Sequence, residues 1–141
     1  MSTTDSSVTS LGLEITTSFA GYDSNTVAVD QVYPAEATRD CFKTLDGQTS
    51  TMQLQNCDLN KTYDFKFYAT RGYIGTSTNF EILGTTVVIN HKGSGNNGNL
   101  TDTVEILNIS PDSSGNININ VSGNGSSNAI GFINVLEISE K

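Results

Sequence analysis

Few side chains in this sequence could act in catalysis. A Ser-His-Asp arrangement needs a histidine base, and the single histidine, His91, lies in the Gly- and Asn-rich segment HKGSGNNGN. No G-x-S-x-G sequence, which would present a nucleophilic serine, occurs in the chain. A pair of carboxylates could hydrolyse a glycosidic bond, but most acidic residues fall in predicted turns or on outward-facing strand positions. The sequence therefore predicts a protein that is not an enzyme.

A second set of side chains suits sugar binding. A glycan needs an exposed aromatic face for the apolar side of the sugar ring and fixed polar groups for its hydroxyls. The chain has no tryptophan, so Tyr73 is the first candidate for the ring and Tyr22 the second. Arg71 and Arg39 could clamp hydroxyls or an acidic sugar through paired N–H groups. The predicted rim is completed by Lys43, His91, Asn96 and Asn97.

Structural roles remain open for the same residues. Either tyrosine could lie flat over the edge of the fold without contacting a ligand. An arginine at the end of a strand is often paired with a nearby acid, and Arg39 is followed directly by Asp40. The sequence leaves both interpretations in place.

The two cysteines, Cys41 and Cys57, lie sixteen positions apart. In an oxidising compartment they could form one disulfide, closing a loop of about 15 residues and contributing roughly 3 kcal/mol in the chain-entropy model. Two buried free thiols are the alternative. A zinc site is not expected from two cysteines and one histidine.

The elements that must position these residues are β-strands. The clearest is the stretch LNKTYDFKFYATR at 59–71, where Tyr63, Phe65, Phe67 and Ala69 fall on one face and polar residues on the other. Further strands are expected at 11–19, 26–32, 80–83, 86–90, 103–109, 116–121 and 130–138, with a turn at 21–25 and a hairpin whose tip is at 46–47. The predicted fold is an all-β antiparallel sandwich, or jelly roll, of about eight or nine strands.

The predicted core consists of apolar residues on the inward faces of these strands. They are Leu13, Ile15, Leu54, Tyr63, Phe65, Phe67, Val87, Ile89, Val104, Ile106, Ile119, Val121, Phe132, Leu136 and Ile138. Residues 11–141 are expected to form one domain after a flexible N-terminal lead, residues 1–10.

Charge and hydropathy exclude several functions. The net charge of −8 disfavours nucleic acid and anionic membranes as partners. No apolar stretch is long enough for membrane insertion, and the N-terminus lacks the regions of a signal peptide. Either Met1 was added to an exported segment, or the protein is made in a cytosol and leaves by another route.

Four segments together resemble a known family. They are YPAEATRDCF at 33–42, CDLNKTYDFKFYATR at 57–71, ISPDSSGNININV at 109–121 and GFINVLEI at 131–138. In order and spacing they resemble non-catalytic carbohydrate-binding modules of the galactose-binding, jelly-roll kind, from secreted multi-domain bacterial proteins. The resemblance implies an extracellular, secreted or cell-surface protein that binds a polysaccharide, with an attached enzyme domain as a partner. No cofactor is expected. Modules of this kind commonly bind a structural calcium ion through Asp and Asn oxygens, and Asp23 with Asn25, or Asp102 with Asp112, could contribute to such a site, although the sequence does not single them out.

This sequence departs from that family at its start. In the family a further strand usually precedes the position of Leu11, whereas this chain has a short polar lead. A partner could supply the missing strand. The alternative function is therefore a structural decoration or fibre subunit of a virion or surface assembly, with an assembly neighbour as its partner.

Overall fold

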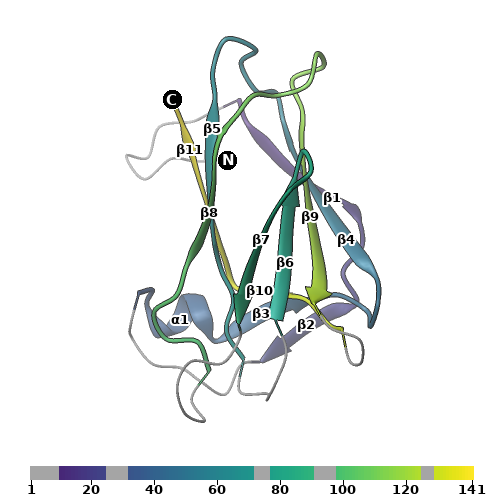
Figure 1. Ribbon diagram of the computed structural model, residues 1–141, viewed down its shortest axis with the longest axis vertical. Coiled ribbons are helices and arrows are strands. Elements are labelled where there is room, and N and C mark those ends of the chain that lie inside the picture. Colours follow the sequence, from purple (N-terminus) through teal and green to yellow (C-terminus); the bar gives the residue numbers. More distant parts are fainter. Residues whose placement is uncertain (1–9, 25–31, 72–76, 91–97, 125–128) are drawn as a thin grey trace.

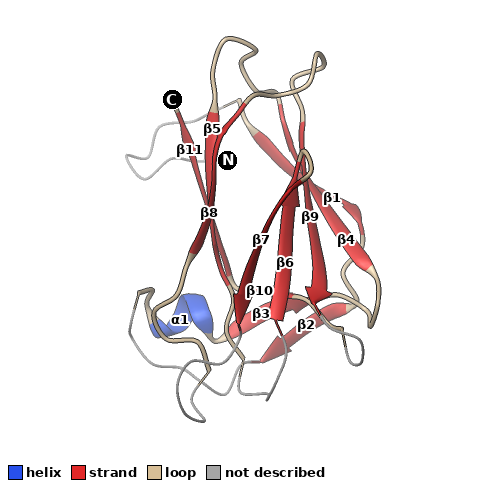
Figure 2. Ribbon diagram, viewed as in Figure 1, coloured by secondary structure: helices blue, strands red, loops and turns tan. Residues whose placement is uncertain are grey.

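The computed structural model describes residues 10–24, 32–71, 77–90, 98–124 and 129–141, which form an antiparallel β-sandwich (Figures 1 and 2). The predicted all-β sandwich is confirmed. The described elements are β1 (Gly12–Thr17), β2 (Gly21–Ser24), α1 (Ala35–Thr38), β3 (Asp40–Lys43), β4 (Thr49–Gln55), β5 (Tyr63–Tyr68), β6 (Ser77–Ile82), β7 (Thr85–Asn90), β8 (Val104–Ile109), β9 (Ile117–Asn124), β10 (Phe132–Ile133) and β11 (Val135–Glu140).

The strands form three sheets. A five-stranded sheet has the order β1-β4-β9-β6-β7, and it faces a three-stranded sheet with the order β11-β5-β8. A small sheet with the order β10-β3-β2 lies at one end of the sandwich, beside α1 (Figure 2). All the pairings in the described residues are antiparallel.

The core is built around β5, as the sequence predicts. Tyr63, Phe65 and Phe67 are fully buried. The ring of Phe67 stacks on that of Phe80 from β6, with 4.3 Å between centroids and 10° between planes. Burying each such side chain stabilises the fold by about 1.5–3 kcal/mol, so this aromatic group holds the two layers together.

Most of the predicted core is confirmed. Nine of the predicted residues are buried, namely Leu54, Tyr63, Phe65, Phe67, Ile89, Ile106, Ile119, Val121 and Phe132, and four more pack against the core while partly buried, namely Val87, Val104, Leu136 and Ile138. The prediction is wrong for Leu13 and Ile15, which are 45% and 46% exposed.

The exposure of these two residues follows from the unequal sheets. Leu13 pairs with Leu54 and Ile15 with Met52, both buried, so all four side chains share the inner face. However, β1 is the outermost of five strands, and the facing sheet has only three. The inner face of β1 therefore extends beyond the layer that would cover it.

Two local predictions are also wrong. The turn at Asp46 and Gly47 forms, but β3 and β4 belong to different sheets and do not make a hairpin. Instead, the N–H of Thr44 donates to the Gly131 carbonyl at 2.9 Å, and the Asp46 carboxylate accepts from the N–H of Ala129. The predicted turn at 21–25 is strand β2 over its first four residues, because pairing with β3 overrides the turn-like composition.

The strand predicted at 130–138 is divided in two. Asn134 separates β10 from β11, and its side chain bonds to three backbone groups outside those strands. This division and the small end sheet raise the strand number above the eight or nine expected. The strand predicted at 26–32 lies almost wholly outside the described residues.

Truncating a side chain to alanine should destabilise the protein much more in the core than on the uncovered edge strand β1. Phe67→Ala removes a fully buried ring and should lower the free energy of unfolding by about 3–5 kcal/mol. Leu13→Ala removes a half-exposed side chain, and we expect a loss of less than about 1 kcal/mol. Urea denaturation of both variants measures the difference, and similar losses would contradict the placement of β1.

The interactions of the Asp64 carboxylate should make the stability of the protein depend on pH. Its carboxylate accepts from the backbone N–H of Asn108 at 2.8 Å and pairs with Lys141 at 3.1 Å. The Asn108 hydrogen bond is the main cause that lowers the pKa of Asp64 below its ordinary value of 3.8. Because the folded pKa is the lower one, this contribution is present above about pH 4 and is lost as the pH falls through the folded pKa.

We therefore expect Asp64→Asn to lower Tm at pH 7, and we expect this Tm difference to shrink as the pH is lowered from 7 to about 2. Thermal melts across that range test this. Glu36→Gln, on the exposed face of α1, is the control and should not change the pH profile. A Tm difference for Asp64→Asn that is the same at every pH would show that its ionisation is not involved.

Candidate functional site

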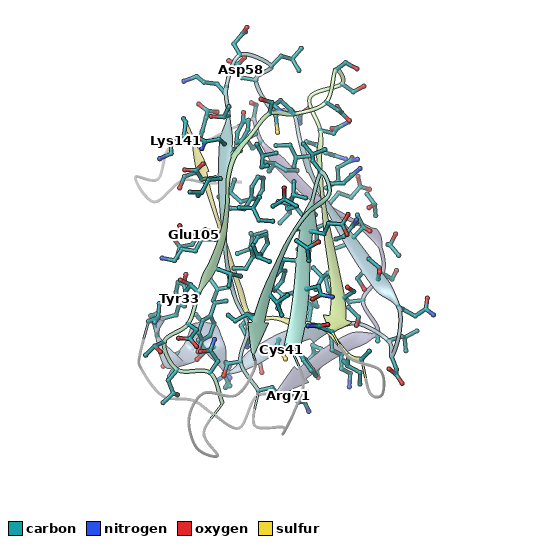
Figure 3. The ribbon with its side chains drawn as sticks, in the orientation of Figure 1. Tyr33, Cys41, Asp58, Arg71, Glu105 and Lys141 are labelled. Atoms are coloured by element: carbon teal, nitrogen blue, oxygen red, sulfur yellow. The ribbon has the colours of Figure 1, made fainter. Side chains whose placement is uncertain are left out.

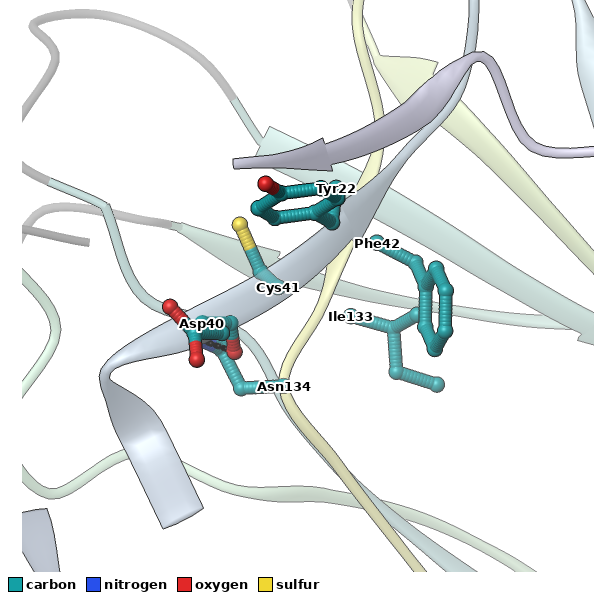
Figure 4. A pocket seen from close by; sticks show the side chains of 6 residues that line it. All are labelled: Tyr22, Asp40, Cys41, Phe42, Ile133 and Asn134. Atoms are coloured by element: carbon teal, nitrogen blue, oxygen red, sulfur yellow. Dashed lines mark hydrogen bonds between the residues drawn. The ribbon is translucent and has the colours of Figure 1, made fainter. Parts of the chain in front are cut away.

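A hollow of about 310 Å³ lies on the small end sheet (Figure 4). It is lined by two aromatic residues, Tyr22 and Phe42, and by Asp40, Cys41, Ile133 and Asn134. Tyr22 is 72% exposed and Phe42 is 50% exposed. Both are large apolar groups in contact with solvent, and they form the candidate site.

Strand register brings the two rings together. In the pairing of β2 with β3, Tyr22 lies directly opposite Phe42, so both side chains are on the same face of the small sheet. In the pairing of β10 with β3, Ile133 lies opposite Phe42 from the other side. Phe42 is held in place by Phe19, whose ring centroid is 5.4 Å away. One row across three strands therefore forms an apolar floor.

The polar groups at the hollow come from the start of β3. The carboxylate of Asp40 lies two residues before Phe42, on the same face of the strand, and is half exposed. The guanidinium of Arg39 lies 3.5 Å from it and is also solvent-exposed. Together they offer acceptors and donors beside the rings.

Asn134 fixes the frame around this site. Its side-chain N–H groups donate to the carbonyls of Thr38 (3.0 Å) and Asp40 (3.1 Å), and its side-chain oxygen accepts from the N–H of Thr70 (2.8 Å). These bonds connect the junction of β10 and β11 to α1, β3 and the end of β5. The backbone that carries Asp40 is therefore held independently of any ligand.

The predicted binding residues are distributed unevenly. Tyr22 lines the hollow. Arg39 is not one of the lining residues, but its guanidinium pairs with the carboxylate of Asp40, which is. Lys43 follows Phe42 on β3 and points to the opposite face. Arg71 lies at the same end of the sandwich as Cys41 (Figure 3). It is buried, with its guanidinium 4.8 Å from the centre of the Phe132 ring, so it contributes little exposed surface. The remaining predicted residues, Tyr73, His91, Asn96 and Asn97, lie outside the described residues.

Sequence reasoning missed Phe42 and Ile133, and it considered Asp40 only as a partner of Arg39. The run Asp40-Cys41-Phe42-Lys43 places two apolar residues side by side, so the sequence pattern does not mark Phe42 as outward-facing. Nothing in the sequence indicates that Tyr22 and Ile133 flank it, because that depends on strand pairing.

Cys41 and Cys57 are both buried free thiols, so the disulfide is absent and the alternative describes the structure. Cys41 lies in the small end sheet, and Cys57 precedes Asp58 at the opposite end of the sandwich (Figure 3). β4 runs between them. Burial is the main cause that raises the pKa of the Cys57 thiol.

A second hollow, of about 360 Å³, lies on the outer face of β11-β5-β8. Four of the five charged side chains that line it form ion pairs. Lys66 lies 3.9 Å from Glu137, and Lys141 lies 3.1 Å from Asp64. The hydroxyl of Tyr33 donates to Glu137 as well. This face lacks an exposed ring among its lining residues, so it suits a sugar less well than the end sheet does.

Metal binding finds no support among the described residues, where no three His, Cys, Asp or Glu side chains cluster. Asp102 and Asp112, proposed as calcium donors, flank opposite ends of β8, and Asn25 of the other proposed pair is not described. Within the described chain, α1 is too short to cross a membrane.

Comparison with known proteins gives a likeness in fold only. No protein-family model matches the chain, and no curated protein matches it. A solved structure of TmCBM61 in complex with β-1,4-galactotriose is similar, with 15% identity over 94% of this chain and 89% of that chain and a TM-score of 0.47. A likeness at this level does not identify ligand-binding residues.

The state of the cysteines can be tested directly. We expect both thiols to react with a thiol reagent such as DTNB only after denaturation, because both are buried. The denatured, unreduced protein should then release two equivalents per chain. Release of none would show a disulfide, and rapid release from the native protein would contradict the burial.

Proposed function

We propose that this protein is a non-catalytic carbohydrate-binding module that acts outside the cell and binds a neutral polysaccharide at the end-sheet hollow. The observation that carries the proposal is the pair of exposed rings, Tyr22 and Phe42, on one face of the small sheet with the Asp40 carboxylate beside them. The exclusion of nucleic acid by net charge agrees with it.

The rings provide the apolar contact. The C–H faces of a pyranose pack on aromatic rings, and exposed rings on rigid strands lose little entropy when a ligand covers them. Phe42 is fixed by Phe19 and by its pairing with both neighbouring strands. Tyr22 lies on the edge strand and keeps its hydroxyl available to solvent as a donor and acceptor.

The polar groups provide orientation. An ionised carboxylate such as that of Asp40 accepts hydrogen bonds from two neighbouring sugar hydroxyls, and the Arg39 guanidinium donates to others. The charge of Asp40 is balanced by Arg39, and the net charge of −8 on the whole chain repels uronic and sulfated polysaccharides. The favoured ligand is therefore a neutral polysaccharide, bound with a free energy of about −4 to −8 kcal/mol per site.

We propose testing binding to a panel of neutral, uronic and sulfated polysaccharides, with a β-1,4-galactan among the neutral ones. We expect the protein to bind only neutral members of this panel. Tyr22→Ala should weaken that binding about tenfold through the lost ring contact, and Asp40→Asn by a similar factor through weaker hydrogen bonds. Isothermal titration and affinity electrophoresis measure the effect. Both substitutions are at exposed positions and should leave Tm nearly unchanged.

Leu59→Ala is the matched control, since Leu59 is 59% exposed and lies at the opposite end of the sandwich near Asp58. It should bind as the unmodified protein does. The assignment of the site fails if Tyr22→Ala and Asp40→Asn retain full affinity for a polysaccharide that the protein binds. The proposed function itself fails if no member of the panel is bound.

A further inference from the structure

Strand β1 is an edge strand of the five-stranded sheet. In the described part of the chain β1 pairs only with β4, so the N–H and C=O groups on its other side have no strand beside them. Free edges of this kind accept an added strand from another chain. β1 has six residues, enough to hold a short extended segment.

The side chains of β1 define what such a strand must carry. Leu13 and Ile15 are two residues apart on the inner face, and each is nearly half exposed. A strand added beside β1 would bury both if it presented apolar residues two positions apart on that face. Such burial removes apolar surface from water that the three-stranded sheet leaves uncovered.

Glu14 supplies a charge between these two residues, on the outer face. Its neighbours across the sheet are Gln53 on β4 and Asn118 on β9, both uncharged, and the sequences of β4 and β9 contain no charged residue. Glu14 is therefore the only charge on these three strands. A residue directly opposite Glu14 on an added strand would be favoured if it were basic.

We propose that the free edge of β1 binds an extended segment of a partner protein with the pattern apolar, basic, apolar. The apolar residues pack beside Leu13 and Ile15, and the basic residue pairs with Glu14. This inference is independent of the sugar site. It specifies where a strand supplied by a partner, as expected from the sequence, would bind and which residues it would carry.

Other occupants fit less well. In an antiparallel pairing of β1 with β1 of a second copy, placing Leu13 opposite Ile15 also places Glu14 opposite Glu14, which is unfavourable. The chain's own lead, MSTTDSSVTS, has only Met1 and Val8 as apolar residues and cannot offer two apolar side chains two positions apart. The net charge of −8 further opposes self-association and favours a basic partner.

The test uses capped peptides with the sequence Gly-Thr-Val-Lys-Val-Thr-Gly and the same peptide with Glu or Gln in place of Lys. NMR titration of the full chain should show amide shifts in β1 and β4 with the Lys peptide, and about fivefold weaker binding of the Glu peptide. Glu14→Lys should invert this preference. Leu13→Ser with Ile15→Ser should weaken binding of all three peptides at least tenfold.

Leu107→Ser is the matched control, because Leu107 is 51% exposed on β8, an edge strand of the other sheet. It should bind the peptides as the unmodified protein does. The proposal is overturned if the Lys and Glu peptides bind equally, if no peptide shifts β1, or if Glu14→Lys leaves the preference unchanged. A concentration-dependent dimer in sedimentation that Ile15→Ser disrupts would also overturn it, since the occupant would then be a second copy.

Discussion

The stacking of Phe67 on Phe80 is the contact on which the rest of this sandwich depends. The two rings come from different sheets, and both are fully buried. Sheets in a sandwich pack about 10 Å apart, so a ring pair that spans the layers fixes their separation and alignment together. Phe65 continues the stack from Phe67 at 6.5 Å, which extends the same alignment along β5.

This alignment decides what remains uncovered. It sets β5 opposite β6, near one side of the five-stranded sheet, and β8 contacts β7 at that side. The three strands of the smaller sheet therefore do not extend as far as β1. The exposure of Leu13 and Ile15 is therefore a consequence of where the three-stranded sheet packs on the five-stranded sheet. It does not follow from the residue types in β1.

At one end, the small sheet continues the second layer. β2 follows β1 in the chain and pairs with β3, and the Ala20 N–H donates to the Lys43 carbonyl at 2.8 Å where the small sheet begins. Phe19 and Phe42 close the fold at this point through their ring contact. Because Phe42 is used on one side for packing and is half exposed on the other, a structural aromatic also becomes part of the candidate site.

The sequence correctly predicts those burial patterns that depend only on the alternation of residues within one strand. Tyr63, Phe65 and Phe67 alternate with polar residues in an uninterrupted run, and this alternation predicts that they lie in the core. Leu13 and Ile15 have the same alternation, but their burial depends on the number of strands in another sheet. The sequence predicts Tyr22 as an exposed aromatic residue. Phe42 lies beside it only through the pairing of β2 with β3, which no local sequence pattern contains.

Charge is arranged so that the two proposed surfaces favour different ligands. Among the described residues, basic side chains lie close to acids. Arg39 pairs with Asp40, Lys61 with Glu140, Lys66 with Glu137 and Lys141 with Asp64. These pairs neutralise one another locally, and the remaining acidic excess gives the molecule a negative field. At the proposed sugar site in the end-sheet hollow, that field repels anionic chains, which is why we propose a neutral polysaccharide as the ligand. At β1, where Glu14 is the only charge on three strands, the same field attracts a basic segment and disfavours a second copy of the chain.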